Sequence, residues 1–346
     1  MTLFERLFVG FVVVPTTIWI ALAIHYHVRG LWWRWFASLV PPVIVGVSLG
    51  LLPMRPWAVA VWFGILLVTI LWWISLRPKS NRDWKTGMDV LPHVDLEGDV
   101  LRIRQFRNFR YETLGDPLLQ YEERTFDLTK LTSLDYFLSH WSGPVIAHTL
   151  VSFGFEDGQY LAVSVEARLQ RWQSYSPLRG IFRSYELLFV MGDERDIIRL
   201  RTNIRRERVY MYRVRVPRPK VRELLIDYLA RAERLEEQPE WYNSITSNCT
   251  TNLFYRGQPR VPWWLKPHVF LNGLSARAMY LRGFLDLGLP YKELQSCCDI
   301  RERALAAGDA ANFSQQIRTH IDPPRPLSSE VLSGHIPDHD DPGSND

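Results

Sequence analysis

The distribution of apolar and charged residues divides the chain into two unequal parts. Three segments near the N-terminus, residues 7–24, 36–53 and 57–76, are almost free of charge and rich in Val, Ile, Leu, Phe and Trp. Each is about 18–20 residues long, enough for a helix to cross roughly 30 Å of hydrocarbon. Nearly all ionisable residues follow Arg77. The pattern predicts a membrane anchor of three transmembrane helices over residues 1–76, with one soluble domain after it.

The first apolar segment admits a second interpretation, a cleaved signal peptide. Its charged start, Glu5 and Arg6, is thin, no small-residue cleavage site follows it, and two more apolar segments come next. These features favour an uncleaved anchor.

The side of the membrane that holds the soluble domain stays open at this point. Three spans place the N-terminus and the domain on opposite sides, and Lys/Arg residues favour the cytoplasm. Arg6 and Arg55 lie on one side, whereas the residues on the other are Arg29, Arg34, Arg77, Lys79, Arg82 and Lys85. The bias indicates a cytoplasmic domain, although long domains can cross regardless of charge.

Beyond the anchor, hydropathy and turn residues predict an α+β domain with an antiparallel sheet and packed helices. Residues 77–92 form a polar juxtamembrane linker, residues 93–321 the domain, and residues 322–346 a disordered tail rich in Pro, Ser, Asp and Gly. Alternating patterns predict strands over residues 94–111 with a turn at Gly98, 147–169, 185–192, 196–202 and 208–216. Apolar residues at helical spacing predict helices over residues 127–141 and 221–237, near Asn248, and over most of 264–287.

The hairpin over residues 147–169 has a register that its own side chains determine. A two-residue Asp157-Gly158 loop would mix apolar and polar residues on both faces. A three-residue loop with Gly158 in the left-handed conformation instead pairs Val151 with Val163 and Phe153 with Leu161, which gives one apolar face. In this register His148 lies opposite Glu166 on the other face, and a carboxylate can hold an imidazole for general-base work.

Cys249 follows two capping residues, Ser247 and Asn248, and precedes an apolar run, so it is expected in the first turn of a helix. That position favours the thiolate. A thiol, a His and a carboxylate suggest nucleophilic catalysis by Cys249, His148 and Glu166. The alternatives are a buried small residue at Cys249 and a structural strand histidine at His148.

Other chemistry has little support in the sequence. The remaining cysteines, Cys297 and Cys298, are adjacent and are expected to be packed thiols rather than half of a disulfide framework. No HExxH and no zinc-like Cys/His spacing occurs, so we expect no metal site and no cofactor. The net charge of +4 gives no nucleic-acid signal, and a lipid bilayer is the expected partner of a tethered domain.

Several stretches of the predicted domain form an ordered set of motifs. They are AHTLVSFGFEDGQYLAVSVEAR (147–168), YELLFVMGDERDIIRLRT (185–202), VYMYR (209–213) and EWYNSITSNCTTNLF (240–254), with RQFRNFRY (104–111) and ANFSQQIR (311–318) at the edges. Over about residues 80–320, these motifs resemble the bacterial family named after the N-terminal periplasmic domain of Lnb, a lipoprotein N-acyltransferase.

The resemblance implies a circularly permuted papain-like, NlpC-type thiol fold in a bacterial inner-membrane protein with a periplasmic domain, contrary to the Lys/Arg bias. It implies that Cys249 attacks a lipid ester, that His148 transfers the proton and Glu166 orients His148. Backbone N–H groups at the start of the Cys249 helix would hold the oxyanion. The acceptor of the acyl group would be an amine or water, and the substrate a membrane lipid or lipoprotein.

Further candidates for substrate binding lie in the matching segments. Arg168, Arg195 and Arg201 can hold a lipid phosphate or a carboxylate, or they can pair with the acidic residues Asp193, Glu194 and Asp196. Tyr242 precedes the Cys249 turn, and Asn248 either caps the helix or points its amide at the oxyanion. Three functions therefore compete: a thiol acyltransferase, a thiol hydrolase (amidase or peptidase) of the envelope, and a non-enzymatic envelope scaffold.

Overall fold

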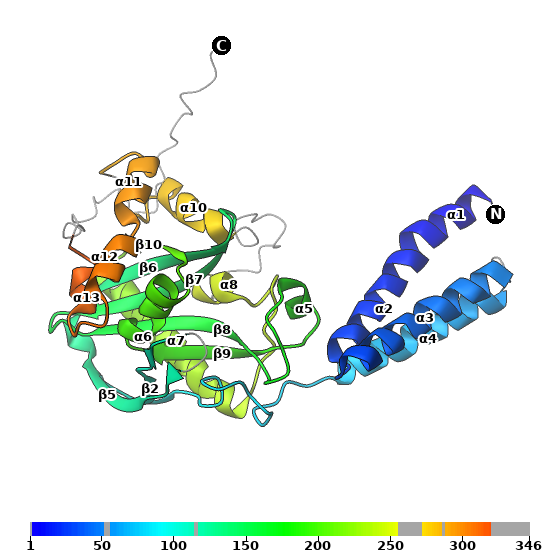
Figure 1. The fold of residues 1–346 in the computed structure, drawn as a ribbon, viewed down its shortest axis with the longest axis horizontal. Coiled ribbons are helices and arrows are strands. Elements are labelled where there is room, and N and C mark those ends of the chain that lie inside the picture. The colour runs from blue at the N-terminus through cyan, green and yellow to red at the C-terminus, as the bar shows by residue number, and fades with distance from the viewer. Residues whose placement is uncertain (1, 52–55, 114–116, 255–271, 286–287, 320–346) are drawn as a thin grey trace, which may run out of the picture.

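The apolar N-terminal segments form helices that project to one side of the rest of the chain (Figure 1). The computed structural model describes all residues except 1, 52–55, 114–116, 255–271, 286–287 and 320–346, so the predicted tail lies outside the described residues. The elements of this helix bundle are α1 (Leu3–Phe8), the π-helical η1 (Val9–Val13), α2 (Val14–His27), α3 (Leu31–Leu51) and α4 (Pro56–Ser75).

Two helices of the bundle, Leu3–His27 and Pro56–Ser75, are long and apolar enough to cross a membrane. The third, α3, contains Pro41 and Pro42 and is not one of these two candidates. The prediction of three transmembrane helices therefore stays a prediction.

One mostly antiparallel sheet organises the remainder of the chain, in the strand order β1-β2-β9-β8-β7-β6-β10 with β5 beside β2. Among the described strands, only β2 and β9 pair in parallel, at Arg107 and Gly192. The strands of this sheet are β1 (His93–Glu97), β2 (Val100–Arg107), β5 (Tyr121–Asp127), β6 (Leu131–Ser142), β7 (Ile146–Phe155), β8 (Tyr160–Arg168), β9 (Glu186–Gly192) and β10 (Arg208–Arg213). A separate two-stranded sheet joins β3 (Arg110–Tyr111) and β4 (Pro117–Leu118).

Helices cover both faces of the large sheet. One face packs against α7 (Arg218–Glu237), α8 (Cys249–Phe254), α10 (Ser275–Leu281) and α11 (Tyr291–Cys298). The other packs against α6 (Glu194–Arg199), α12 (Arg301–Ala307) and α13 (Phe313–Gln316). Shorter elements are α5 (Pro177–Ile181), the π-helical η3 (Leu200–Ile204), and the 3-10 helices η2 (Leu128–Lys130) and η5 (Asn272–Leu274). The prediction of an α+β architecture is confirmed.

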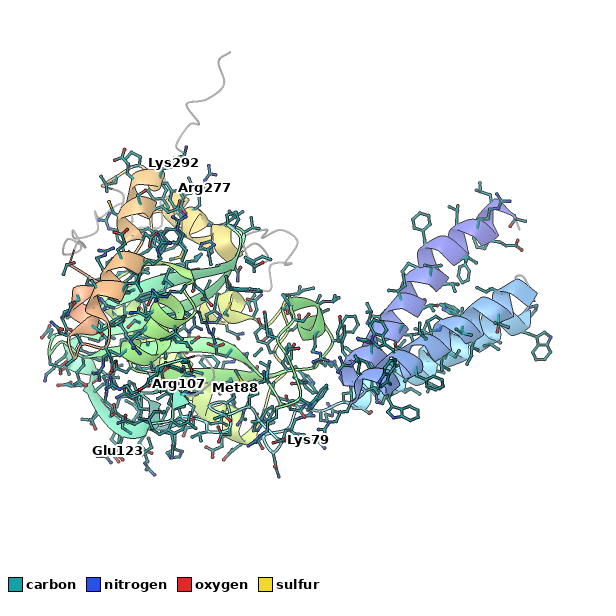
Figure 2. The ribbon with its side chains drawn as sticks, in the orientation of Figure 1. Lys79, Met88, Arg107, Glu123, Arg277 and Lys292 are labelled. Carbon is teal, nitrogen blue, oxygen red and sulfur yellow. The ribbon has the colours of Figure 1, made fainter. Side chains whose placement is uncertain are left out.

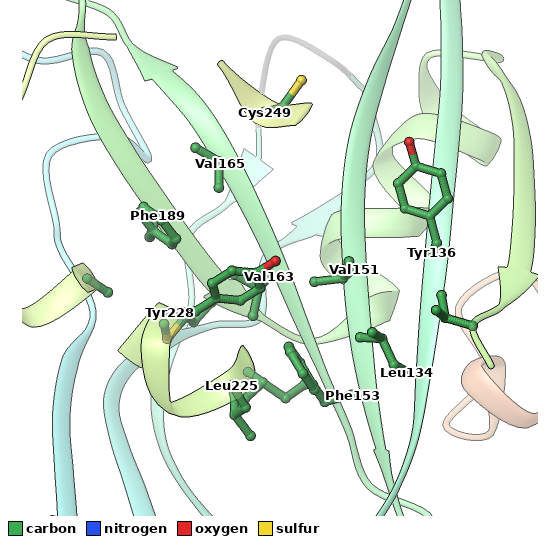
Figure 3. Close-up of a cluster of buried hydrophobic side chains, with 14 of the residues drawn as sticks. Leu134, Tyr136, Val151, Phe153, Val163, Val165, Phe189, Leu225, Tyr228 and Cys249 are labelled. Carbon is green, nitrogen blue, oxygen red and sulfur yellow. The ribbon is translucent and has the colours of Figure 1, made fainter. Parts of the chain in front are cut away.

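The amphipathic helix α7 shows how the core forms. Its apolar stripe is buried, and Tyr228 lies at its centre, with ring centroids 6.0 Å from Phe153 and 6.1 Å from Phe189 (Figure 3). These aromatic contacts join α7 to β7 and β9. The helix predicted over residues 221–237 is thus confirmed, and it packs against β7, the strand that carries His148.

Two predicted elements are wrong. Residues 127–141 form η2 and then β6 instead of a helix, because β6 lies between β7 and β10 with both faces covered. A strand buried on both faces loses its alternation, and its apolar run imitates helical spacing. The strand expected over residues 196–202 is α6 and η3, which begin where the Asp193 side chain accepts a hydrogen bond from the Arg195 N–H. The predicted turn at Gly98 and the strands on either side are confirmed.

None of the three cysteines, all of them among the described residues, forms a disulfide. Cys298 is buried, as expected, whereas Cys297 is exposed, so the prediction of packed thiols is wrong for Cys297. The two are adjacent on α11, and only one of them can face the sheet.

The linker over residues 77–92 lies against the domain. Figure 2 shows it passing from Lys79, beside the bundle, to Met88, against the domain. The Lys85 N–H donates to the Leu169 carbonyl at 2.9 Å, and the Arg82 guanidinium lies 2.6 Å from the Glu186 carboxylate. The linker thus follows the ends of β8 and β9, which are also close to the candidate site.

A buried cluster of charges fixes the last described helix. Arg318 donates to Asp135 and to Glu194 at 2.6–2.9 Å, and both carboxylates are fully buried. We predict that Arg318→Ala lowers the free energy of unfolding by about 3–5 kcal/mol, because the buried carboxylate of Glu194 loses both contacts with Arg318 and that of Asp135 keeps its ion pair with Arg213 alone. Thermal unfolding followed by near-ultraviolet circular dichroism measures this loss. The control is Arg222→Ala, which removes an exposed ion pair with Asp99 and should cost about 1 kcal/mol or less. Equal losses in both variants would contradict the prediction.

Candidate active site

The site begins where β7 and β8 separate. The predicted register is confirmed: Val151 pairs with Val163 and Phe153 with Leu161, and Gly158 has φ +81° in the turn. The last pair of the ladder is Leu150–Ser164, and beyond it the two strands diverge, with α8 lying above the gap (Figure 3). His148 and Glu166 lie two residues past this last pair, so their side chains meet at the open end of the hairpin.

A serine bridges the predicted His148–Glu166 pair. The Ser164 hydroxyl donates to Glu166 Oε1 at 2.7 Å and accepts from His148 Nε2 at 2.7 Å, while Nε2 and Oε1 are 3.5 Å apart. This arrangement keeps the proton of a neutral imidazole on Nε2, and Nδ1 is then the nitrogen able to take a proton from a thiol. Sequence reasoning missed Ser164, although its position two residues before Glu166 on the same strand places both on one face.

Glu166 is held in its charged form. Burial raises the pKa of its carboxyl group, but His148, the Arg201 guanidinium at 2.8 Å and the Ser164 hydroxyl outweigh burial and hold the pKa well below its usual range. Arg201 is itself buried and also donates to the Ile197 carbonyl at 2.8 Å. Glu166 therefore carries a negative charge beside the His148 imidazole at neutral pH.

The loop before α8 places Cys249 opposite His148. The backbones of Asn243 and Ser247 exchange two hydrogen bonds of 3.0 Å, which closes a tight turn. Asn248 Oδ1 then accepts from the N–H groups of Thr250 and Thr251 at 2.9 Å each, so Asn248 caps the helix, and Cys249 is the first residue of α8. The predicted position of Cys249 in a first helical turn is confirmed.

The surroundings of Cys249 favour its thiolate. Burial raises the pKa of the thiol, but the charge of His148 and hydrogen bonds from His148 and Thr149 outweigh it and lower the pKa to about 6. One of these bonds comes from the backbone of Thr149, which lies past the last β7–β8 pair. The separation of the strands thus gives the sulfur both an imidazole and a backbone donor.

Asn272 is a second residue that the sequence did not suggest. Its Oδ1 accepts from the Ala147 N–H at 2.8 Å, its Nδ2 donates to the Ala147 carbonyl, and Nδ2 lies 3.8 Å from Cys249 Sγ. The contact with both backbone groups of Ala147 fixes which end of the amide faces the sulfur. Asn272 stands 23 residues after Cys249 outside any recognisable motif, so no local signal points to it.

Cys249 and His148 lie in a cavity of about 900 Å³. Its wall is largely apolar and includes side chains of β6–β8, α5, the segment between β8 and α5, and the loop before α8, namely Trp141, Ile146, Val165, Ala167, Leu169, Tyr175, Leu178, Ile181 and Ile245. The volume lies within the range of about 300–1,000 Å³ typical of ligand pockets.

Among the described residues, no group of three or more His, Cys, Asp or Glu side chains is arranged to hold a metal ion.

The other predicted binding residues are only partly brought together. Arg201, Tyr242 and Asn248 line the Cys249 cavity. Arg168 lines a different pocket, donates to the carbonyls of Met88 and Asp89, and lies 4.2 Å from the Trp84 ring. Arg195 bonds Asp193, which is the ion pairing considered as its alternative.

The chain is thus an α+β protein in which a thiol, an imidazole and a carboxylate meet in one largely apolar cavity. Residues 118–264 match the family model of the Lnb N-terminal periplasmic domain, which supports the family that the motifs predicted. No curated protein and no solved structure matches the chain, and the papain-like permutation stays a prediction. The family indicates a periplasmic, envelope-related role, which together with the two candidate spans is consistent with an inner-membrane protein.

We predict that alkylation of Cys249 by iodoacetamide is half-maximal near pH 6, whereas an ordinary thiol needs about pH 8.5. The thiolate reacts, so the rate rises with pH through the lowered pKa. In His148→Ala, burial still raises the pKa of the Cys249 thiol, but His148 no longer lowers it. The midpoint of alkylation should therefore move above about pH 8.5. Peptide mass spectrometry separates Cys249 from Cys297 and Cys298. A midpoint near pH 8.5 in both proteins would contradict the prediction.

Ser164→Ala tests the bridge between His148 and Glu166. Loss of a hydrogen bond to a charged group costs about 1.5–3 kcal/mol, so alkylation at pH 6 should slow by about 10–100-fold and the midpoint should move upward. The matched control is Ser152→Ala on β7, whose hydroxyl is also buried but makes no hydrogen bond with the described residues. A purely structural role of Ser164 would leave the pH midpoint in place.

Proposed function

We propose that this chain is a membrane-anchored, thiol-dependent acyltransferase that acts on a lipid or lipoprotein of the bacterial envelope. The observation that carries the proposal is the contact of Cys249 with His148 in a largely apolar cavity, with the thiol pKa lowered to about 6. A nucleophile that is mostly thiolate at pH 7 suits attack on an ester, and an apolar wall suits the hydrocarbon part of a lipid.

In the proposed reaction, the Cys249 thiolate attacks the carbonyl carbon of a lipid ester. The tetrahedral intermediate breaks its bond to the alcohol oxygen, His148 donates a proton to that oxygen, and a thioester to Cys249 remains. An amine then attacks the thioester, His148 accepts its proton, and the thiolate leaves as the amide forms. Glu166 stabilises His148 in the steps in which the imidazole is charged, and the Ser164 hydroxyl, which lies between Glu166 and the imidazole, holds the ring in place.

Asn272 is the proposed donor to the oxyanion. The sequence suggested backbone N–H groups at the start of α8, but those of Thr250 and Thr251 already donate to Asn248. The Asn272 amide lies 3.8 Å from the sulfur, close enough for a carbonyl oxygen of a bound ester to reach it.

A periplasmic domain is part of the proposal, although the Lys/Arg bias favours the cytoplasm. Several of the basic residues behind that bias make contacts within the protein. Arg29 donates to Gln170 at 3.1 Å and lies 5.6 Å from the Trp172 ring, and Arg34 lies 6.0 Å from the same ring. Arg82 pairs with Glu186. Arg29 and Arg34 thus make contacts between the bundle and the domain, and Arg82 holds the linker against the domain, so counting them as topology signals overstates the bias.

The test is intact-mass analysis of the full-length protein in nanodiscs after addition of a diacyl phospholipid, with and without a lipopeptide amine. We expect a hydroxylamine-sensitive acyl adduct on Cys249 and N-acyl product with the amine. His148→Ala should lower the rate of adduct formation by about 10²–10⁴-fold. Cys249→Ala should abolish the adduct, and Cys297→Ala, which changes an exposed thiol, should retain it.

Other outcomes of this experiment separate the competing functions. Release of free acid without amide, even with the amine present, would favour a thiol hydrolase. The absence of any adduct, together with an unchanged cell-envelope phenotype in Cys249→Ala, would favour a non-enzymatic scaffold.

A further inference from the structure

The short helix α5 separates the Cys249 cavity from the helix bundle. Leu178 and Ile181 are three residues apart on one side of α5, and both line the cavity. Arg179 and Phe182 are likewise three residues apart and face the bundle. The Arg179 guanidinium lies 5.5 Å from the Tyr26 ring, and the centroid of the Phe182 ring lies 5.3 Å from it. The partition between the thiol cavity and the bundle is therefore one helix thick, about 10–12 Å.

The residues directly after α5, Phe182 and Arg183, bind the ends of α2 and α4. Arg183 Nη1 donates to the Trp73 carbonyl at 2.8 Å, and the Arg183 carbonyl lies 3.3 Å from His27 Nε2. The centroid of the Phe182 ring lies 6.0 Å from that of Trp73. On the domain side, Gly180 lies so close to Ser244 that a side chain at this position would overlap it. The segment is thus held by the bundle and by the loop before Cys249 (Figure 1).

The rim of the cavity near α5 consists of large apolar side chains that are partly open to solvent. Trp141, Tyr175 and Leu178 line the cavity, yet they are 44 %, 44 % and 46 % exposed. The Trp141 and Tyr175 rings meet edge to face at 6.0 Å. Contiguous exposed apolar surface at a cavity is typical of a binding site for an apolar ligand.

The apolar side chains that line the cavity favour a hydrocarbon chain over a peptide. Glu166 already bonds Arg201 and Ser164, and Glu207 lies 3.8 Å from Arg205. Val165, Ala167, Leu169 and Ile181 offer no side-chain hydrogen bonds. An extended peptide needs partners for its backbone groups, whereas an acyl chain needs none.

We propose that α5, with Trp141 and Tyr175, forms an acyl-chain subsite that a membrane lipid enters from the bundle side, so that its ester carbonyl reaches Cys249. This inference rests on the proposed acyltransferase function. It specifies which wall binds the hydrocarbon and from which direction the substrate comes.

Binding is tested first, without chemistry, in full-length Cys249→Ala reconstituted in nanodiscs that contain a phosphatidylcholine with a diazirine in one acyl chain. After illumination, we expect cross-links at Trp141 and in residues 175–181, in addition to those in α2–α4 that bulk lipid produces. Cross-links confined to α2–α4 overturn the subsite. Because this variant lacks the thiol, the result is independent of whether the chain is an acyltransferase.

The second test measures kcat/KM for acylation of Cys249 by p-nitrophenyl esters of increasing chain length, in full-length protein. Each methylene buried against α5 should raise kcat/KM by about fourfold until the subsite is filled. Leu178→Ser should lower kcat/KM for the palmitoyl ester by about tenfold and leave the acetyl ester within about twofold. Leu305→Ser, on α12 and 37 % exposed, is the matched control and should change neither.

The outcomes distinguish the two proposals. A flat chain-length dependence, or equal losses for both esters in Leu178→Ser, overturns the subsite and leaves the thiol acyltransferase standing. Failure of every ester to acylate Cys249 overturns the acyltransferase, and cross-links at α5 would then still identify a lipid-binding wall. Cross-linking of a photoreactive peptide, but not of the lipid, at residues 175–181 would assign the wall to a peptide substrate.

Discussion

The pairing of β7 with β8 is the constraint on which the candidate site depends. A slip of one residue would send Val151, Phe153, Val163 and their neighbours to the wrong face of the sheet, and this burial makes the register unique. The same register brings His148 and Glu166 to the open end of the hairpin, where the ladder stops at Leu150 and Ser164. Core packing thus determines the position of two polar side chains that contribute little to the core themselves.

The end of the ladder is as important as its register. If the pairing continued to Arg168, strand-to-strand hydrogen bonds would occupy the edge that Cys249 approaches. Because the strands separate, α8 can lie above the gap and its first residue can contact His148 and Thr149 (Figure 3). Burial alone would protonate the thiol and neutralise Glu166. The charged groups that face each other across this gap outweigh burial in both cases, and a low-dielectric setting strengthens those interactions.

Local patterns predicted the parts of the site that neighbouring residues determine. The hairpin register followed from alternation around Gly158, and the position of Cys249 followed from the capping residue Asn248. The bridging hydroxyl of Ser164 could have been found from its spacing to Glu166. Asn272 could not, because its role arises from contact with Ala147 on a strand 125 residues away in sequence. The misassigned β6 has a related cause, since its pattern reflects partners on both sides rather than its own period.

The contacts at the base of the bundle make the anchor part of the domain's architecture. A spanning helix adapts to bilayers of different thickness by tilting. If α4 spans a bilayer, a tilt of α4 would move Trp73, whose carbonyl accepts a hydrogen bond from Arg183 in the segment that follows α5. The wall of the thiol cavity would then shift with the tilt, so the thickness of the bilayer would affect the shape of the cavity. Residues 77–320 without the helix bundle would lose this dependence and would also expose the ring of Phe182.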